Sequence, residues 1–151
     1  ENTKAPEFKL LNQEGNSVSL SDFAGKPLIL YFYPKDDTPG CTTEACSSRD
    51  DYSVYQDLDV EIVGISPDDV ASHGKFAQKY ELPFTLLADE GHRVSEAYGA
   101  WGKKVNFGKE YEGILRTTFL IDGTGVVRRV FKGVKPDGHS QEVMEALKAL
   151  D

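Results

Sequence analysis

The sequence predicts an α/β domain with a mixed central β-sheet and helices on both faces, and two observations carry this prediction. The run 27–34 is continuously apolar, without the alternation of a half-exposed strand, as is typical of a central strand buried on both faces, and 60–66 is a second candidate for a buried strand. Each run is followed by a helical pattern, which favours parallel strands that are connected by helices packed on the faces of the sheet. The length of 151 residues suits one domain, so we expect residues 1–151 to form a single unit.

Two hairpins are expected to complete the sheet. Residues 8–20 read as two short strands around the polar tract Asn12-Gln13-Glu14-Gly15-Asn16, which predicts an N-terminal β-hairpin. Residues 116–122 and 126–131 read as two further strands, joined by the turn sequence Asp122-Gly123-Thr124-Gly125.

The helices follow from their start signals. The first is expected from Thr38 or Pro39 to about Asp57, and the second with Ser66 as its N-cap and Pro67 in its first position. The remaining expected elements are a strand over 84–89, a helix over 93–98, a glycine- and aromatic-rich surface loop over 99–113, and a helix from about residue 140. This element order is the layout of a thioredoxin-like fold.

Composition narrows the function classes. The chain carries 17 basic and 25 acidic residues, a formal net charge of −8, which disfavours nucleic acid and anionic membranes as partners. No run approaches the roughly 18 apolar residues of a membrane span. Two cysteines are too few for a disulfide scaffold, and no signal peptide is visible at the start. We therefore expect a cytoplasmic location, unless a leader has been removed upstream.

The two cysteines lie in one stretch after the first buried strand. Thr38 is a good N-cap, Pro39 suits the first helical position, and Cys41 then lies in the first turn. Unpaired backbone N–H groups at a helix start favour a negative charge, and the thiolate is the form of cysteine that attacks. This position predicts a reactive thiol at Cys41.

The five-residue spacing of Cys41 and Cys46 limits what the pair can do. In an intact helix their Cα atoms would lie roughly 8 to 9 Å apart, whereas a disulfide needs less than about 7 Å. A disulfide would thus require the first turns to unwind, which favours a reversible bond over a static one. Two cysteines fall short of a structural zinc site, and the spacing differs from Cys-x-x-Cys. Burial as small hydrophobic residues stays open, above all for Cys46.

A thiolate at Cys41 needs a cation, because Asp36, Asp37 and Glu44 are close in sequence and disfavour its charge. Arg116, at the start of a predicted central strand, and Arg49, two turns along the same helix, are the candidates. For both, the alternative is an ordinary surface arginine.

The stretch resembles the active-site signature of the peroxiredoxins, Pro34-x-x-x-Thr38-x-x-Cys41. The longer pattern Thr38-Pro39-Gly40-Cys41-Thr42-x-x-Ala45-Cys46 is similar to the bacterioferritin-comigratory, or peroxiredoxin Q, branch. Three further segments extend the resemblance over nearly the whole chain: Ala5-Pro6-x-Phe8, Gly64-Ile65-Ser66, and the strand from Arg116 to Asp122.

This resemblance implies a role for each matching residue. Cys41 would be the peroxidatic cysteine and Cys46 the resolving cysteine. Thr38 would hydrogen-bond the peroxide and the thiolate, Arg116 would hold both electrostatically, and Pro34 would shield the pocket from water. The expected substrates are hydrogen peroxide and small organic hydroperoxides, without a metal or an organic cofactor.

The resemblance also implies a redox cycle. Cys41 would become a sulfenic acid, Cys46 would attack it to form an intrachain disulfide, and thioredoxin or a similar dithiol would reduce that bond. An intrachain disulfide needs no second subunit, so we expect a monomer. Two other functions stay open from sequence: a redox sensor whose helix unwinding exposes a partner surface, and a thioredoxin-like disulfide reductase.

Overall fold

A computed structural model of the chain describes residues 3–50, 52–57, 59–106 and 108–132. The larger sheet contains, among these residues, the strands β1 (Thr3–Lys4), β2 (Lys9–Asn12), β3 (Ser17–Ser19), β4 (Leu28–Phe32), β5 (Glu61–Ser66), β6 (Thr85–Ala88), β9 (Thr117–Ile121) and β10 (Val126–Lys132). Their order across the sheet is β1-β10-β9-β4-β5-β6-β2-β3. The helical elements are η1 (Leu20–Phe23), α1 (Pro39–Asp50), α2 (Tyr52–Asp57), α3 (Val70–Lys79) and α4 (Arg93–Ala97). The mixed sheet of a thioredoxin-like α/β fold is thus confirmed.

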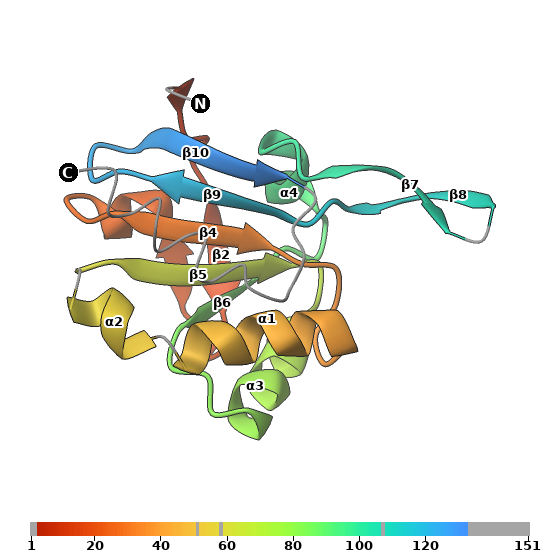
Figure 1. Cartoon of the computed structure of the whole chain (residues 1–151), viewed down its shortest axis with the longest axis horizontal. Helices are drawn as coiled ribbons and strands as arrows, with labels where there is room; N and C mark the ends of the chain where they lie inside the picture. The colour runs from red at the N-terminus through yellow and green to blue at the C-terminus, as the bar shows by residue number, and fades with distance from the viewer. Residues whose placement is uncertain (1–2, 51, 58, 107, 133–151) are drawn as a thin grey trace.

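Strand directions bring several segments to one edge of the sheet. Strands β4, β5 and β6 are parallel, so their carboxyl ends meet at the same edge. Strand β9 runs antiparallel to β4, with Thr117 opposite Phe32, so β9 begins at the edge where β4 ends. The segment before α1 and the residue before β9 therefore lie next to each other (Figure 1).

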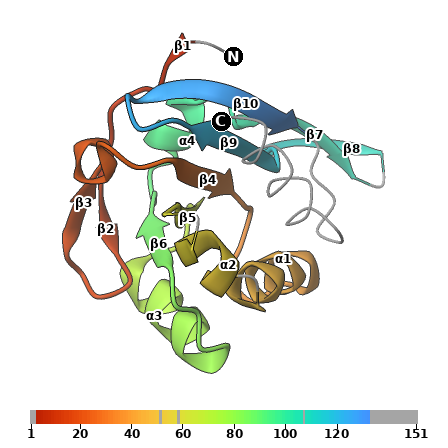
Figure 2. The same cartoon turned by 60° about the vertical axis from the view of Figure 1, so that its left-hand side comes forward.

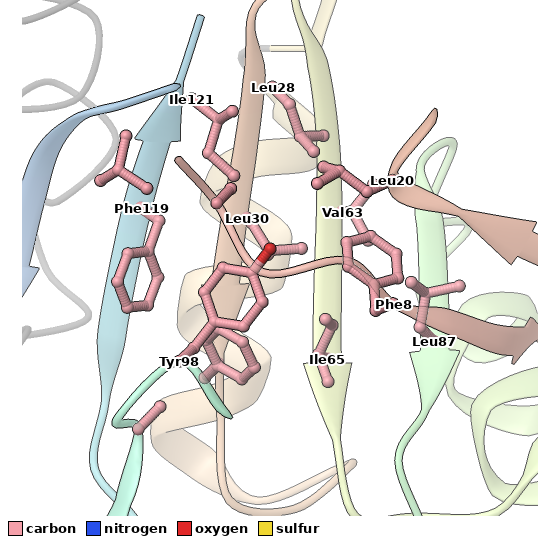
Figure 3. Packing of buried hydrophobic residues seen from close by; sticks show 14 of the residues in the cluster. Phe8, Leu20, Leu28, Leu30, Val63, Ile65, Leu87, Tyr98, Phe119 and Ile121 are labelled. Atoms are coloured by element: carbon pink, nitrogen blue, oxygen red, sulfur yellow. The ribbon is translucent and has the colours of Figure 1, made fainter. Parts of the chain in front are cut away.

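Helices cover both faces of the sheet, as predicted. Figure 2 shows α1, α2 and α3 on one side and α4 on the other. Along β4, successive side chains alternate between two cores, because neighbouring residues of a strand point to opposite faces. Ile29 and Tyr31 pack in the core under α1 to α3, whereas Leu28 and Leu30 pack in the second core (Figure 3). The continuous apolar pattern of residues 27–34 has this double burial as its cause.

Each core also draws on segments outside the sheet. Cys41, Ala45, Tyr55 and Phe76 bring α1, α2 and α3 into the first core. In the second core, Phe8, Leu20 and Tyr98 cover the sheet from the N-terminal segment and the end of α4 (Figure 3). None of the helices in the described part of the chain is long and apolar enough to span a membrane.

Both expected hairpins form. Strand β2 pairs with β3 around the polar turn, and β9 pairs with β10 across Asp122 to Gly125. Within that second turn, the Asp122 carboxylate accepts hydrogen bonds from the backbone N–H groups of Thr124 and Val126. The expected helix from about residue 140 lies outside the described residues.

One helix boundary differs from the prediction. The helix expected up to about Asp57 is described as α1 and α2, on either side of residue 51, which lies outside the described residues. Helix α3 begins at Val70, with Asp69 as its N-cap, and the prediction of Ser66 as N-cap was wrong. The Asp69 carboxylate accepts from the backbone N–H of Ser72 and caps α3, whereas the Ser66 hydroxyl is bonded to Asp68, donating to its carboxylate at 2.6 Å and accepting from its N–H at 3.3 Å.

The prediction of a surface loop over 99–113 was also wrong. This stretch forms a separate two-stranded hairpin, β7 (Trp101–Asn106) and β8 (Lys109–Ile114). The last pair of the hairpin is Asn106 with Lys109, and Gly108 has φ +77°, a left-handed value that glycine adopts without strain. The glycines and charged residues of the segment hid its strand pattern, and Gly108 was the local signal that could have revealed it.

Gly64 is required because the end of the Tyr31 side chain lies against its Cα. Gly64 lies opposite Tyr31 in the β4–β5 pair, and a Cβ added to it would lie 2.8 Å from the Cζ and Oη atoms of Tyr31. Replacement by any larger residue must therefore displace the Tyr31 ring within a packed core.

We predict that Gly64→Ala lowers the free energy of unfolding by about 1–3 kcal/mol through overpacking. Gly74→Ala is the matched control. Gly74 lies inside α3 and its added Cβ would meet only the Gln13 carbonyl, at 3.4 Å. Here the substitution should raise stability by up to about 1 kcal/mol, because alanine is the better helix former. Urea denaturation measures both, and equal effects would contradict the packing argument.

Candidate active site

The start of α1 places Cys41 at the carboxyl edge of the central sheet. Helix α1 begins at Pro39, as predicted from the Thr38-Pro39 pair. The carbonyl of Thr38 accepts a hydrogen bond from the backbone N–H of Thr42 at 2.8 Å, which sets Cys41 within the first turn. The Thr38 hydroxyl donates to the Lys35 carbonyl at 2.9 Å and ties the preceding loop together. Cys41 is 1% exposed and packs in the core under the helix.

Arg116 supplies the cation that a thiolate at Cys41 needs. Its Nη2 atom lies 2.9 Å from the Cys41 sulfur and donates to it, across 75 positions of the chain. This contact exists because Arg116 directly precedes β9, the strand beside β4. Arg49, the other candidate, points elsewhere, since it binds Asp50 and the carbonyl of Tyr80. The structure thus decides between the two arginines that the sequence left open.

Two of the acidic residues expected to disfavour a thiolate are paired with other groups. Asp37 is exposed and binds Lys79 at 2.7 Å and the Tyr80 hydroxyl at 2.8 Å. The hydrogen bond from Lys79, and then that from Tyr80, hold the pKa of Asp37 below its usual range. Asp36 is buried and accepts hydrogen bonds from several side chains. Paired in this way, these carboxylates oppose a negative charge on Cys41 much less than their sequence positions suggested.

Asp36 is the centre of a buried hydrogen-bond network under the loop that leads to Cys41. Its carboxylate is bonded by the Tyr33 hydroxyl at 2.6 Å, the Ser72 hydroxyl at 2.8 Å and Nδ1 of His73 at 2.6 Å. Burial raises the pKa of Tyr33 well above its usual range, so the Tyr33 hydroxyl keeps its proton and donates it. These hydrogen bonds hold Asp36 in place, and with it the loop between β4 and α1.

His73 completes this network and is fully buried. Its Nε2 atom lies 2.8 Å from the Leu87 carbonyl, and its Nδ1 atom faces Asp36. Both ring nitrogens therefore face oxygen atoms of the protein, so His73 joins the loop before α1 to strand β6. No local motif in the sequence indicates this link.

Asp36, Asp68 and His73 are also the group of described residues whose ligand atoms lie close enough to hold a metal ion. Their atoms are already used by protein donors. Asp68 accepts from the Ser66 hydroxyl and the Asp36 backbone N–H, and both nitrogens of His73 are engaged. A cation would have to displace these donors, so we interpret the group as a structural network.

Cys46 lies on the same helix as Cys41. It is half-buried, and both cysteines are free thiols. One helical turn further, the hydrogen bond to Asp50 raises the pKa of Arg49, and nearby Cys46 contributes a smaller effect in the same direction. Pro34, half-buried, lies between β4 and α1. Pro34, Thr38 and Cys41 therefore belong to the segment that leads from β4 into the first turn of α1. Arg116 approaches Cys41 from the start of the neighbouring strand β9.

Comparison with known proteins agrees with this geometry. Residues 2–130 match the AhpC/TSA family. Peroxiredoxin Bcp of Bacillus subtilis is 50% identical over 147 residues, covering 97% of this chain and 94% of its own. A putative peroxiredoxin Bcp of Coxiella burnetii is 55% identical over 144 residues, covering 95% of each chain.

Among solved structures, the bacterioferritin comigratory protein of Xanthomonas campestris superposes with a TM-score of 0.90 and 36% identity, over 94% of this chain and 90% of its own. That structure was determined as a trapped intermediate and ligand complex, to explain alkyl peroxide reduction by that protein. The chain belongs to the AhpC/TSA family and, within it, to the peroxiredoxins of the bacterioferritin-comigratory, or peroxiredoxin Q, group.

Proposed function

We propose that this peroxidase acts through Cys41 as the peroxidatic cysteine and Cys46 as the resolving cysteine. The observation that carries the proposal is the 2.9 Å contact between Arg116 and the Cys41 sulfur. A guanidinium at this distance favours the thiolate over the thiol, and the first turn of α1 adds its unpaired N–H groups. The related Xanthomonas campestris protein reduces alkyl peroxides, which supports organic hydroperoxides as substrates beside hydrogen peroxide.

The first step is an attack by the Cys41 thiolate on one oxygen of the peroxide. The S–O bond forms as the O–O bond breaks, and the electron pair leaves with the second oxygen, which takes up a proton to become water or an alcohol. Cys41 is oxidised to a sulfenic acid and the peroxide is reduced. Arg116 is the proposed donor to the departing oxygen, joined by the Thr38 hydroxyl once this hydroxyl turns away from the Lys35 carbonyl, and Pro34 is proposed to exclude water.

The second step joins the two cysteines. The Cys46 thiol attacks the Cys41 sulfenic acid, so that the S–S bond forms and water leaves. In the folded helix both thiols are free, and their positions on α1 keep them apart. The first turns of α1 must therefore unwind in each cycle, and they must re-form after an external dithiol has reduced the disulfide.

Thioredoxin or a similar dithiol is the proposed reductant, since exchange with a dithiol returns both cysteines to thiols. We also propose that the protein works as a monomer, because its resolving cysteine lies in the same helix. A cytoplasmic location fits this cycle, which needs a reducing compartment. The chemistry uses side chains alone, so neither a metal nor an organic cofactor is part of the proposal.

The two cysteines can be separated by substitution. Cys41→Ser should abolish peroxide consumption, because serine is a far weaker nucleophile at neutral pH. Cys46→Ser should retain one turnover and leave a sulfenic acid that dimedone traps, detected by mass spectrometry. Sustained turnover of Cys41→Ser with thioredoxin would contradict the assignment. Slow oxidation of the unaltered protein without turnover by any dithiol would instead favour a redox sensor.

Arg116→Met should lower the second-order rate constant for peroxide by about 10²- to 10³-fold, the usual effect of removing one donor to a developing charge. Arg116→Lys should recover part of the rate, because the charge returns without the planar guanidinium. Stopped-flow measurement of Cys41 oxidation is the readout. Arg128→Met is the control, since Arg128 lies on β10 and pairs with Asp122. An equal loss in both variants would remove Arg116 from the proposed site.

A further inference from the structure

Both ends of α1 are held by one residue of the neighbouring helix. Tyr80 follows the last residue of α3 and serves as its C-cap. The Tyr80 hydroxyl donates to Asp37, just before α1, and the Tyr80 carbonyl accepts from Arg49, in the last turn of α1. The two cysteines lie between these two attachments. We refer to Asp37, Arg49, Lys79 and Tyr80 as the α3 clamp.

The attachment before α1 is a paired one. The two carboxylate oxygens of Asp37 bind different partners, the Tyr80 hydroxyl at 2.8 Å and the Lys79 ammonium at 2.7 Å. Asp37 has φ +58°, a left-handed conformation that aspartate tolerates better than most residues and that turns the chain into α1. The ring of Tyr80 is itself held against Phe76, with ring centroids 5.5 Å apart.

The attachment at the end of α1 uses a group that α3 leaves unsatisfied. The last carbonyls of a helix have no partner within that helix, and they carry partial negative charge. Nη1 of Arg49 is the partner of one such carbonyl, because it donates to the Tyr80 carbonyl at 2.8 Å. Nε and Nη2 of the same guanidinium bind Asp50. One guanidinium therefore joins the end of α1 to the end of α3.

The sequence of α1 makes these attachments matter. The helix reads PGCTTEACSSRD, in which glycine, threonine, serine, cysteine and aspartate, all poor helix formers, predominate. Twelve residues would also form a marginal helix in isolation. Outside contacts must therefore hold α1 folded, and the buried ones come from Cys41 and Ala45. Oxidation of Cys41 changes the first of these two contacts. The clamp then contributes a larger part of the stabilisation that keeps α1 folded.

We propose that Tyr80 is a positioning residue that holds both ends of α1 and sets how readily this helix unwinds once Cys41 is a sulfenic acid. The inference rests on the proposed function, because it concerns the step that joins Cys41 to Cys46. The clamp slows disulfide formation and lengthens the life of the sulfenic acid. A longer-lived sulfenic acid is exposed for longer to a second peroxide, which oxidises it to the sulfinic acid.

The clamp can remain closed while the disulfide forms. A helix of this length spans about 18 Å at 1.5 Å per residue, whereas the same chain fully extended reaches about 40 Å. Unwound residues 38–48 therefore have slack enough to bring the two sulfurs together between fixed ends. After reduction, the helix can re-form from ends that never left their places.

The test follows the two steps separately in the full chain. Rapid-quench mass spectrometry counts Cys41 as thiol, sulfenic acid or disulfide after mixing with hydrogen peroxide. Tyr80→Phe removes only the hydroxyl and keeps the ring and the carbonyl. It should leave the rate of sulfenic acid formation unchanged and raise the rate of disulfide formation by about two- to five-fold, the range set by losing exposed polar contacts. Sulfinic acid at high peroxide should fall by a similar factor.

Two further variants make the result specific. Arg49→Met releases the other end of α1 and should also accelerate disulfide formation. Lys75→Met, an exposed lysine of α3 outside the clamp, should change neither step. As a second measurement, amide hydrogen exchange in reduced Tyr80→Phe should show weaker protection over residues 41–46 than in the unaltered protein.

The outcomes distinguish a failure of the clamp proposal from a failure of the proposed function. If Tyr80→Phe and Arg49→Met both form the disulfide at the unaltered rate, with unchanged amide protection, the clamp has no role in resolution. A fall in the sulfenic acid rate of Tyr80→Phe, without faster disulfide formation, would overturn the positioning role as well. If the unaltered protein forms no sulfenic acid with peroxide, the proposed function itself fails.

Discussion

The contact between the Arg116 guanidinium and the Cys41 sulfur brings together the two halves of the site. It depends on β9 lying beside β4 in antiparallel register, because this arrangement starts one strand where the other ends. Both strands are buried along their whole length, so their relative position is set by the core rather than by surface groups. A site built on such strands keeps the arginine aimed at the thiol without a mobile loop. The reactive group and its cation are thus consequences of sheet order.

The charges around Cys41 are arranged so that two nearby acids do not oppose its thiolate. Asp36 is hydrogen-bonded by Tyr33, Ser72 and His73 within a buried network, and Asp37 is bound at the surface by Lys79. Buried polar groups are costly unless they are hydrogen-bonded, and the donors of this network satisfy the Asp36 carboxylate. In this protein the network lies directly below the loop between β4 and α1. The loop is therefore held from below by Asp36 and from the side by Asp37.

A weak helix in a rigid frame suits a reaction that requires the same residues to be ordered and then disordered. The surrounding strands and α3 are well packed, whereas α1 consists largely of small polar residues that favour the helix poorly. Among the described side chains of α1, unwinding withdraws Cys41 and Ala45 from the first core. Contacts at the ends of the helix can then adjust the balance between its two states by small amounts, which fits a step that must occur once in every cycle.

Local patterns in the sequence determined the parts of this protein that depend on near neighbours. The unbroken apolar runs predicted β4 and β5, the Thr38-Pro39 pair predicted the start of α1, and the cysteine spacing predicted thiols kept apart by a helix. The hairpin of β7 and β8 was missed because its strands carry glycines and charges, and the start of α3 was placed too early because Ser66 and Asp69 are both suitable N-cap residues. Only the tertiary structure selected Arg116 over Arg49, joined Asp36 to His73, and tied both ends of α1 to Tyr80. These contacts link residues about 30 to 75 positions apart, and no local periodicity or cap encodes which distant segments the sheet will bring together.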